Sequence, residues 1–223
     1  AVATRLATEG RSLSEQLTRG HFANGVVALM ALGGSTNAAI HLVAMARRVG
    51  LTDFGLADIA EAGRDVPVLA NIFPSGEYMM QDFHDAGGMP ALLWQLKDRL
   101  DLDALCVDGQ SLGAAIKGAK VWDDKVICRP DAPVTDRPAL AVLKGSLAPG
   151  GAVIKPSAAS PALLRHEGRA VVFDGPADLA ARIDVEDIAA DDILVLRGGG
   201  PVGAPGMPEW GNLQIPKALL KKG

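Results

Sequence analysis

The chain has 223 residues and a formal net charge of −4; 48% of the residues are hydrophobic and 22% are charged. This length allows one large domain or two small ones around a sizeable core. Acidic and basic residues are interspersed without a dense Lys/Arg cluster, no apolar run is long enough to cross a membrane, and no signal peptide opens the chain, so we expect neither a nucleic acid nor a membrane as a partner.

Residues 1–105 are predicted to be rich in helices. Apolar residues recur there at helical spacing, and the helix expected at 38–49 ends with Arg47 and Arg48, which complement the helix dipole, before Gly50. We predict helices at 20–32, 38–49, 52–62, 78–86 and 90–100, and a buried strand at 66–72.

The sequence changes character near residue 105, where the apolar runs become short and β-branched. We predict strands at 126–127, 140–143, 152–154, 170–173 and 193–196, with helices near 111–115 and 176–183. Together these patterns predict an α/β protein: residues 1–105 form the C-terminal part of a helix-rich α/β domain, and residues 106–223 form a β-rich, barrel-like or sandwich-like domain.

The two cysteines, Cys106 and Cys128, stand 22 residues apart without a nearby Cys or His. Two cysteines cannot by themselves form a zinc or iron–sulfur site. We therefore expect two ordinary core thiols in a reducing cytoplasm.

The ends of the sequence are unusual for a complete protein. The chain opens without Met inside a predicted helix and stops at Lys221-Lys222-Gly223. We expect it to be an internal fragment.

A glycine- and proline-rich loop, residues 198–212, follows the predicted strand at 193–196, and Glu209 is its only ionisable residue. Glycines let a backbone approach a ligand closely, and a lone carboxylate there is suited to a hard cation such as Mg²⁺. A structural turn with a solvated glutamate explains the loop equally well.

Five segments together resemble the dihydroxy-acid/6-phosphogluconate dehydratase family. They are ALGGSTNA at 31–38 followed by HL at 41–42, PSGEYMMQDF at 74–83, AGGMP at 86–90, GSLAPGGAV at 145–153, and the glycine loop that ends in GMPE at 206–209. Within the family, KPSAASP at 155–161, GRAVVF at 168–173 and WGN at 210–212 are more similar to the sugar-acid dehydratases, which act on aldonates such as arabinonate or xylonate.

The resemblance implies a hydro-lyase that removes water from a 2,3-dihydroxy acid to give a 2-keto-3-deoxy acid. It also implies a [2Fe-2S] cluster, or sometimes [4Fe-4S], together with Mg²⁺, since hydroxide leaves readily only when a metal takes its charge. Glu209 matches the family's carboxylate ligand to Mg²⁺. The resemblance places the cluster cysteines upstream of this chain and the catalytic serine beyond Gly223, so the chain alone is expected to hold no cluster and no catalytic residue.

Seven further residues are predicted to bind substrate, each with a structural alternative. Ser35, Thr36 and Asn37 form a polar group at a predicted helix start, where they bind an anion or simply cap the helix. Ser75 and Tyr78 occupy a strand-to-helix turn, where they either contact a ligand or belong to a buried turn. Lys155 and Ser157 line the pocket from the second domain or belong to a turn at Pro156.

Two other functions remain open. One is dihydroxy-acid dehydratase of branched-chain amino-acid biosynthesis, within the same family. The other is a non-catalytic module that binds a small anion at the glycine loop. The family resemblance implies a small hydroxy-acid substrate and, for the complete enzyme, a homodimer or homotetramer.

Overall fold

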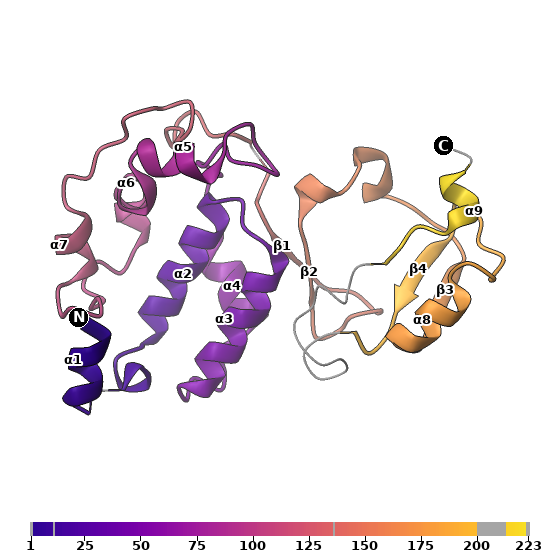
Figure 1. Ribbon diagram of the computed structural model, residues 1–223, viewed down its shortest axis with the longest axis horizontal. Helices are drawn as coiled ribbons and strands as arrows, with labels where there is room; N and C mark the ends of the chain where they lie inside the picture. The colour runs from indigo at the N-terminus through magenta and orange to yellow at the C-terminus, as the bar shows by residue number, and fades with distance from the viewer. Residues whose placement is uncertain (1, 11, 136, 200–212, 222–223) are drawn as a thin grey trace. The chain divides into compact units, whose positions relative to one another are not determined.

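A computed structural model of the chain describes residues 2–10, 12–135, 137–199 and 213–221 (Figure 1). These residues divide into two compact units, Ala1–Ala159 and Ser160–Gly223, called unit 1 and unit 2 below. The domain boundary that we predict at residue 105 stays a prediction.

Unit 1 is mainly helical. Its α-helices are α1 (Val2–Thr8), α2 (Arg19–Ala31), α3 (Thr36–Arg48), α4 (Leu56–Ala62), α5 (Met80–Asp85), α6 (Gly88–Gln95) and α7 (Leu112–Ile116). Short 3-10 helices are η1 (Leu13–Glu15), η2 (Lys97–Arg99) and η3 (Pro156–Ala158), and the strands are β1 (Ala141–Leu143) and β2 (Ala152–Ile154). The helices predicted at 20–32, 38–49, 52–62, 78–86, 90–100 and 111–115 are confirmed, with ends shifted by a few residues.

Helix α2 is the centre of this unit and packs against α3, α4 and α6 (Figure 1). Its buried residues are Phe22, Val26, Val27, Leu29, Met30 and Ala31. Helix α3 buries only Ala39 and Ala46, so the two helices approach closely: a Cβ atom on Gly25 of α2 would lie 3.3 Å from Leu42 Cδ2 of α3. Small residues thus set the spacing of the pair that carries the site described below.

The strand predicted at 66–72 is wrong, although the segment is buried as expected. Val68 and Ala70 form isolated bridges with Thr135 and Ile127, and the N–H groups of Leu69 and Ala70 both donate to the carbonyl of Ala31. Because the segment divides its backbone hydrogen bonds among several partners, no continuous ladder forms. The predicted strand at 126–127 is likewise reduced to the bridge made by Ile127.

Strands β1 and β2 form an antiparallel hairpin in which Val142 pairs with Val153. Strand β1 contacts α4, and a Cβ atom on Gly151, whose φ is +101°, would come within 2.9 Å of Leu56 Cδ1. Glycine at this position therefore lets the hairpin lie close to α4. The hairpin places Lys155, the residue after β2, within hydrogen-bonding distance of Gly33.

Unit 2 contains η4 (Pro161–Leu164), β3 (Ala170–Phe173), α8 (Pro176–Arg182), β4 (Ile193–Leu196) and α9 (Lys217–Leu220). Strands β3 and β4 are parallel, with Phe173 opposite Leu196, and α8 connects them. The strands predicted at 140–143, 152–154, 170–173 and 193–196 and the helix predicted at 176–183 are confirmed. A small cluster of Val171, Phe173, Leu179 and Ile183 forms the core of this unit.

These elements agree with an α/β protein. The described residues contain two two-stranded sheets and no closed barrel, so the barrel-like domain stays a prediction. Helices in the described part of the chain are too short or too polar to span a bilayer.

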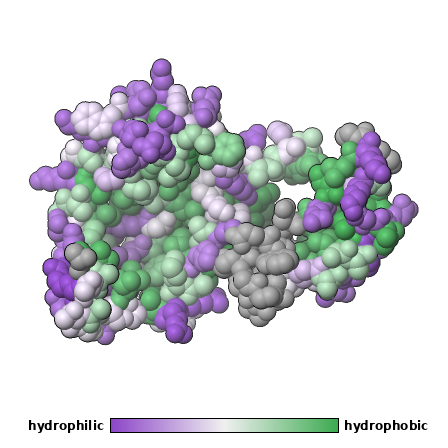
Figure 2. Space-filling view, viewed as in Figure 1, coloured by the Kyte–Doolittle hydropathy of each residue, from purple (hydrophilic) through white to green (hydrophobic). Residues whose placement is uncertain are grey.

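Both cysteines are free and half-buried, which corrects the expectation of core thiols. Hydrophilic and hydrophobic residues are intermixed on the visible face of unit 1 (Figure 2). The exposed apolar side chains of this unit include Phe73, Met79 and Met80.

Candidate functional site

The turn between α2 and α3 is the foundation of the candidate site. The N–H of Gly33 donates to Met30 O at 3.0 Å and the N–H of Gly34 donates to Leu29 O at 2.9 Å, which is the hydrogen-bond pattern of a Schellman motif. Gly33 has a φ of +65°, a left-handed conformation that favours glycine. The turn gives two carbonyl groups at the end of α2 their hydrogen-bond partners. The carbonyl groups of Gly33 and Gly34 remain available to other donors.

Ser35 follows this turn and caps the N-terminus of α3, because its Oγ accepts a hydrogen bond from the N–H of Asn37 at 3.2 Å. Thr36 is the first residue of the helix. The capping role that we gave as the structural alternative for this group is therefore present. It does not exclude ligand binding, since the hydroxyl of Thr36 and the helix dipole remain beside the cavity described next.

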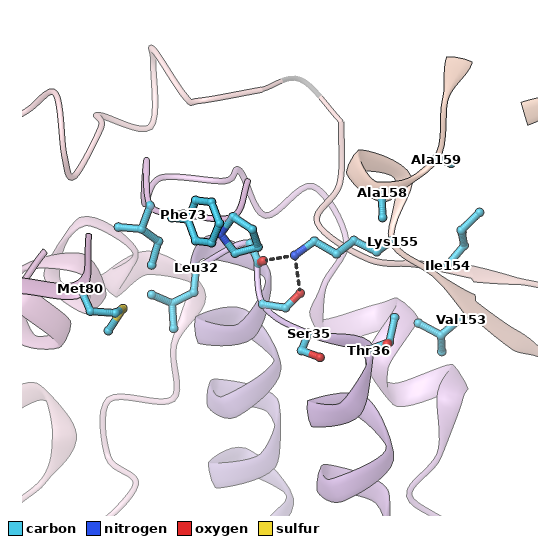
Figure 3. A pocket seen from close by; sticks show the side chains of 14 residues that line it. Leu32, Ser35, Thr36, Phe73, Met80, Val153, Ile154, Lys155, Ala158 and Ala159 are labelled. Atoms are coloured by element: carbon cyan, nitrogen blue, oxygen red, sulfur yellow. Dashed lines mark hydrogen bonds between the residues drawn. The ribbon is translucent and has the colours of Figure 1, made fainter. Parts of the chain in front are cut away.

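Lys155 reaches the turn from the end of β2 (Figure 3). Its Nζ donates to Gly33 O at 2.7 Å and to Gly34 O at 3.3 Å. Partial burial lowers the pKa of this ammonium below its ordinary value of 10.5. No carboxylate in the described part of the chain forms an ion pair with it, so its charge is balanced only by carbonyl dipoles.

A cavity of about 700 Å³, the main cavity, lies where Lys155 meets the turn. Its lining residues are Leu32, Gly33, Gly34, Ser35, Thr36, Ile72, Phe73, Pro74, Met80, Val153, Ile154, Lys155, Ala158 and Ala159. Figure 3 shows Leu32, Phe73 and Met80 on one side of the turn, with Val153 and Ile154 on the other. Most of the wall is apolar, with one cation and two hydroxyl groups, a composition typical of small-molecule sites.

A second cavity of about 270 Å³, the side cavity, shares Gly33 with the main cavity. Its other lining residues are Val68, Ser75, Val134, Thr135, Arg137, Pro138, Ala139 and Ser157. The predicted site residues are therefore divided between the two cavities, with Ser35, Thr36 and Lys155 in the first and Ser75 and Ser157 in the second.

The remaining predicted residues lie elsewhere. Asn37 and Tyr78 line neither cavity. Tyr78 is half-buried against the core of unit 1, and its backbone pairs with Asn71 and Phe73, as the structural alternative for this residue expects. Glu209 lies outside the described residues, and its role stays a prediction.

Sequence reasoning missed Thr135 and Arg137. They lie in a stretch, 130–139, with three prolines and, among its described residues, no regular helix or strand, so no periodic pattern marks them. The bridge between Thr135 and Val68 brings them to the Gly33 turn. The available signal was a basic residue, Arg137, in a proline-rich segment.

The described residues do not fit an iron–sulfur cluster. No three His, Cys, Asp or Glu side chains among them gather into a group that could hold a metal. Burial, followed by the charge of Asp108, raises the pKa of the Cys106 thiol, and burial followed by Asp124 raises that of Cys128. A metal ligand must be a thiolate, so a raised pKa makes each cysteine a poorer ligand. What this arrangement can do is hold an anion, because a half-buried ammonium and a helix N-terminus meet at one cavity.

Comparisons with known proteins match both parts of the chain to one family. The family model described as "Dihydroxy-acid/6-phosphogluconate dehydratase N-terminal" matches residues 1–115, and the corresponding C-terminal model matches residues 125–223.

Three relatives illustrate the similarity. A 6-deoxy-6-sulfo-D-gluconate dehydratase of Pseudomonas putida is 49% identical over 98% of this chain and 38% of that protein. An L-arabonate dehydratase of Azospirillum brasilense is 46% identical over 98% of this chain and 38% of that protein. A dihydroxy-acid dehydratase of Caldanaerobacter subterraneus subsp. tengcongensis is 43% identical over 88% of this chain and 35% of that protein. The chain thus spans well under half the length of these relatives.

Proposed function

The chain belongs to the dihydroxy-acid/6-phosphogluconate dehydratase family, and on that premise we propose that its full-length gene product dehydrates a 2,3-dihydroxy sugar acid to a 2-keto-3-deoxy acid. Two of the relatives described above carry sugar-acid names. The similarity of segments 155–161 and 168–173 to sugar-acid dehydratases points the same way.

The observation that carries this proposal is the placement of Lys155. An ammonium has three N–H donors, and the carbonyls of Gly33 and Gly34 accept two of them. The third is left for a ligand oxygen in the main cavity. Lys155 would therefore bind the substrate carboxylate, with the hydroxyls of Ser35 and Thr36 at the same cavity.

This contact has a chemical consequence for dehydration. Loss of the C2 proton next to a carboxylate accumulates negative charge on the acid, and a fixed cation lowers the cost of that charge. Lys155 acts in this proposal by orienting the acid and stabilising its charge.

We also propose the cofactors that the family resemblance implies, an iron–sulfur cluster of the [2Fe-2S] or [4Fe-4S] type and Mg²⁺ with Glu209 as a ligand. When bound, these metals supply Lewis acidity. In the full-length gene product, Glu209→Gln should lower Mg²⁺ affinity and activity while the visible absorption of the cluster is unchanged. Unchanged activity would remove Glu209 from the site.

The competing function is dihydroxy-acid dehydratase of branched-chain amino-acid biosynthesis. Two observations favour it: the Caldanaerobacter relative carries that name, and the walls of the main cavity are apolar enough for a branched side chain. The side cavity favours the sugar acids, because its hydroxyl groups suit a polyol better than an alkyl group.

One assay separates these proposals. The iron-loaded full-length product is given L-arabinonate, D-xylonate or 2,3-dihydroxyisovalerate, and keto-acid formation is measured. We expect turnover of a sugar acid. Turnover of the branched-chain acid alone would establish the competitor, and anion binding without any turnover would favour a non-catalytic module.

Three broader statements belong to this proposal. The full-length product is a cytoplasmic homodimer or homotetramer, and residues 106–223 belong to a β-rich, barrel-like domain. Light scattering on the purified product tests the assembly. A monomer at micromolar concentration would contradict it.

A further inference from the structure

The loop at residues 72–77, called the cavity loop below, forms part of the wall of the main cavity. It contributes Ile72, Phe73 and Pro74 to the lining, and Figure 3 shows Phe73 on the same side of the cavity as Leu32. Phe73 is 68% exposed, so packing of its ring on the core does not hold it in place. The position of this part of the wall therefore depends on what holds the backbone of the loop.

Asn71, the residue before the cavity loop, holds it with four hydrogen bonds. Its Oδ1 accepts from the N–H of Glu77 at 3.1 Å, and its Nδ2 donates to the carbonyl of Lys125 at 3.2 Å. Its backbone N–H donates to Val126 O at 2.9 Å, and its carbonyl accepts from the N–H of Tyr78 at 3.0 Å. One residue thus joins the two ends of the loop to each other and to a segment that is distant in sequence.

Glycine at position 76 lets the loop close on the Asn71 side chain. A Cβ atom on Gly76 would lie 2.4 Å from Asn71 Oδ1 and 2.4 Å from the carbonyl carbon of the same residue, so only a residue without a side chain fits there. The N–H of Gly76 donates to Ile72 O at 2.7 Å, and the N–H of Phe73 donates to Tyr78 O at 2.7 Å. The cavity loop is therefore a tight turn closed around one amide group.

We propose that Asn71 is a positioning residue of the candidate site, whose amide fixes the cavity loop so that Phe73 and Pro74 contact the carbon chain of the bound acid. This inference rests on the proposed function, which places the carboxylate of that acid at Lys155. Asn71 lines neither cavity, so it acts on the acid only through the loop. A loop without this anchor has to be ordered when the acid binds, and that ordering weakens binding.

Asn24 offers a matched control, because its side chain makes the same pair of hydrogen bonds elsewhere in unit 1. Its Nδ2 donates to Asp101 O at 2.9 Å, and its Oδ1 accepts from the N–H of Asp101 at 2.8 Å. Asn24 lines neither cavity. Alanine at position 24 or 71 deletes two side-chain hydrogen bonds to the backbone, so both variants should lose stability to a similar extent. Only the change at Asn71 should also weaken binding of the acid.

The experiment compares the full-length, iron-loaded product as wild type, Asn71→Ala, Asn71→Asp, Gly76→Ala and Asn24→Ala. Kinetics with L-arabinonate, D-xylonate and 2,3-dihydroxyisovalerate measures turnover. Calorimetry measures binding of the 3-deoxy analogue of L-arabinonate and of 2-hydroxyisovalerate, which cannot lose water because they lack the C3 hydroxyl group. Hydrogen-exchange mass spectrometry of the peptide around Glu77 measures how firmly the cavity loop is held.

We expect Asn71→Ala to speed exchange at Glu77 and to raise Kd and KM about ten-fold, the loss that corresponds to one hydrogen bond. The kcat should stay within about two-fold, because a contact made equally in the ground and transition states affects KM alone. Gly76→Ala should reproduce these changes. Asn71→Asp keeps an oxygen that accepts from Glu77 and should show a smaller increase, whereas Asn24→Ala should bind the acid as wild type does. If Asn71→Ala does not fold, Asn71→Asp and Gly76→Ala carry the same test.

The outcomes separate this inference from the proposed function. If only the branched-chain acid is turned over, and Asn71→Ala binds 2-hydroxyisovalerate more weakly than Asn24→Ala does, the proposed function fails and the positioning role stands. If a sugar acid is turned over, and Asn71→Ala binds its analogue as wild type does although Glu77 exchanges faster, the positioning role is wrong and the proposed function stands. Equal weakening in Asn71→Ala and Asn24→Ala, or no binding of either analogue by wild type, would also overturn the positioning role.

Discussion

Lys155 Nζ lies 2.7 Å from the carbonyl oxygen of Gly33, a residue 122 positions earlier in the chain. This hydrogen bond joins the end of β2 to the turn between α2 and α3. It fixes an ammonium over the N-terminus of α3, at the edge of the main cavity. The fold thus holds the proposed substrate-binding ammonium in place through this hydrogen bond.

Removal of the ammonium should weaken substrate binding. Lys155→Met keeps most of the side-chain volume and deletes the charge, and a charged hydrogen bond of about 2–3 kcal/mol corresponds to a loss of roughly 30- to 150-fold in kcat/KM. Steady-state kinetics of the full-length product measures it. Lys144→Met, in the exposed loop after β1, is the control and should behave as wild type; an equal loss in both variants would argue against a specific contact.

The pH dependence of KM should report the charge of Lys155. Burial lowers the pKa of this residue below 10.5, so the ammonium loses its proton earlier than a free lysine as the pH rises. Below the lowered pKa the cation binds the acid, and above it KM should increase. In Lys155→Arg the guanidinium stays charged, and the alkaline increase should disappear. The same increase in both proteins would assign it to another group.

Glycine at position 33 should matter for activity beyond its effect on stability. Gly33 and Gly50 both have positive φ, +65° and +94°, so an alanine at either position should cost about 1–2 kcal/mol of folding free energy. Only Gly33→Ala should also lower activity, since its carbonyl holds Lys155. Urea denaturation and kinetics of both variants separate the two effects. Equal activity in the two variants would mean that the position of this carbonyl is unimportant.

Acid should destabilise unit 2 through Asp192. The side chain of Asp192 is 6% exposed and accepts from Arg169 Nη2 at 2.6 Å and Nε at 3.2 Å. The hydrogen bond from Arg169, with one from the Ala189 N–H, lowers the pKa of this carboxyl below 3.8. The contribution to stability is therefore complete above pH 3.8 and is lost as the pH falls through the lowered pKa.

The variant Asp192→Asn tests this contribution. Its unfolding midpoint should lie below that of wild type at pH 7, and the difference should shrink as the pH falls below 3.8. Asp191→Asn is the neighbouring control, because Asp191 is exposed and bonds His166 through its backbone carbonyl only. A difference between wild type and Asp192→Asn that does not change with pH would show that the ion pair is not its source.

The sequence predicted most elements that have their own periodicity. Helices α2 and α3 and strands β1 to β4 were found because each has a local pattern of apolar residues. The failure at residues 66–72 has a physical cause: continuous apolar runs indicate burial, but whether a ladder forms depends on partners that are distant in sequence. Residues near 126 and 135 supply those partners singly.

The same distinction applies to the candidate site. Ser35, Thr36 and Lys155 lie in motifs that resemble a known family, and the structure brings them to one cavity. Arg137 reaches the neighbouring cavity through a non-local bridge at Thr135, for which no local pattern exists. Tyr78 occupies a promising turn in the sequence, yet its side chain packs on the core. The local sequence predicts the turn at Tyr78, but it does not predict the direction in which the tyrosine side chain points.

The most direct test of the account is keto-acid formation from a sugar acid by the full-length, iron-loaded gene product, followed by NMR for wild type and Lys155→Met. The account predicts that wild type converts L-arabinonate, D-xylonate or a six-carbon aldonate to its 2-keto-3-deoxy acid, and that Lys155→Met does so with a much higher KM. No product from any of these acids, with turnover of 2,3-dihydroxyisovalerate by both proteins, would contradict it.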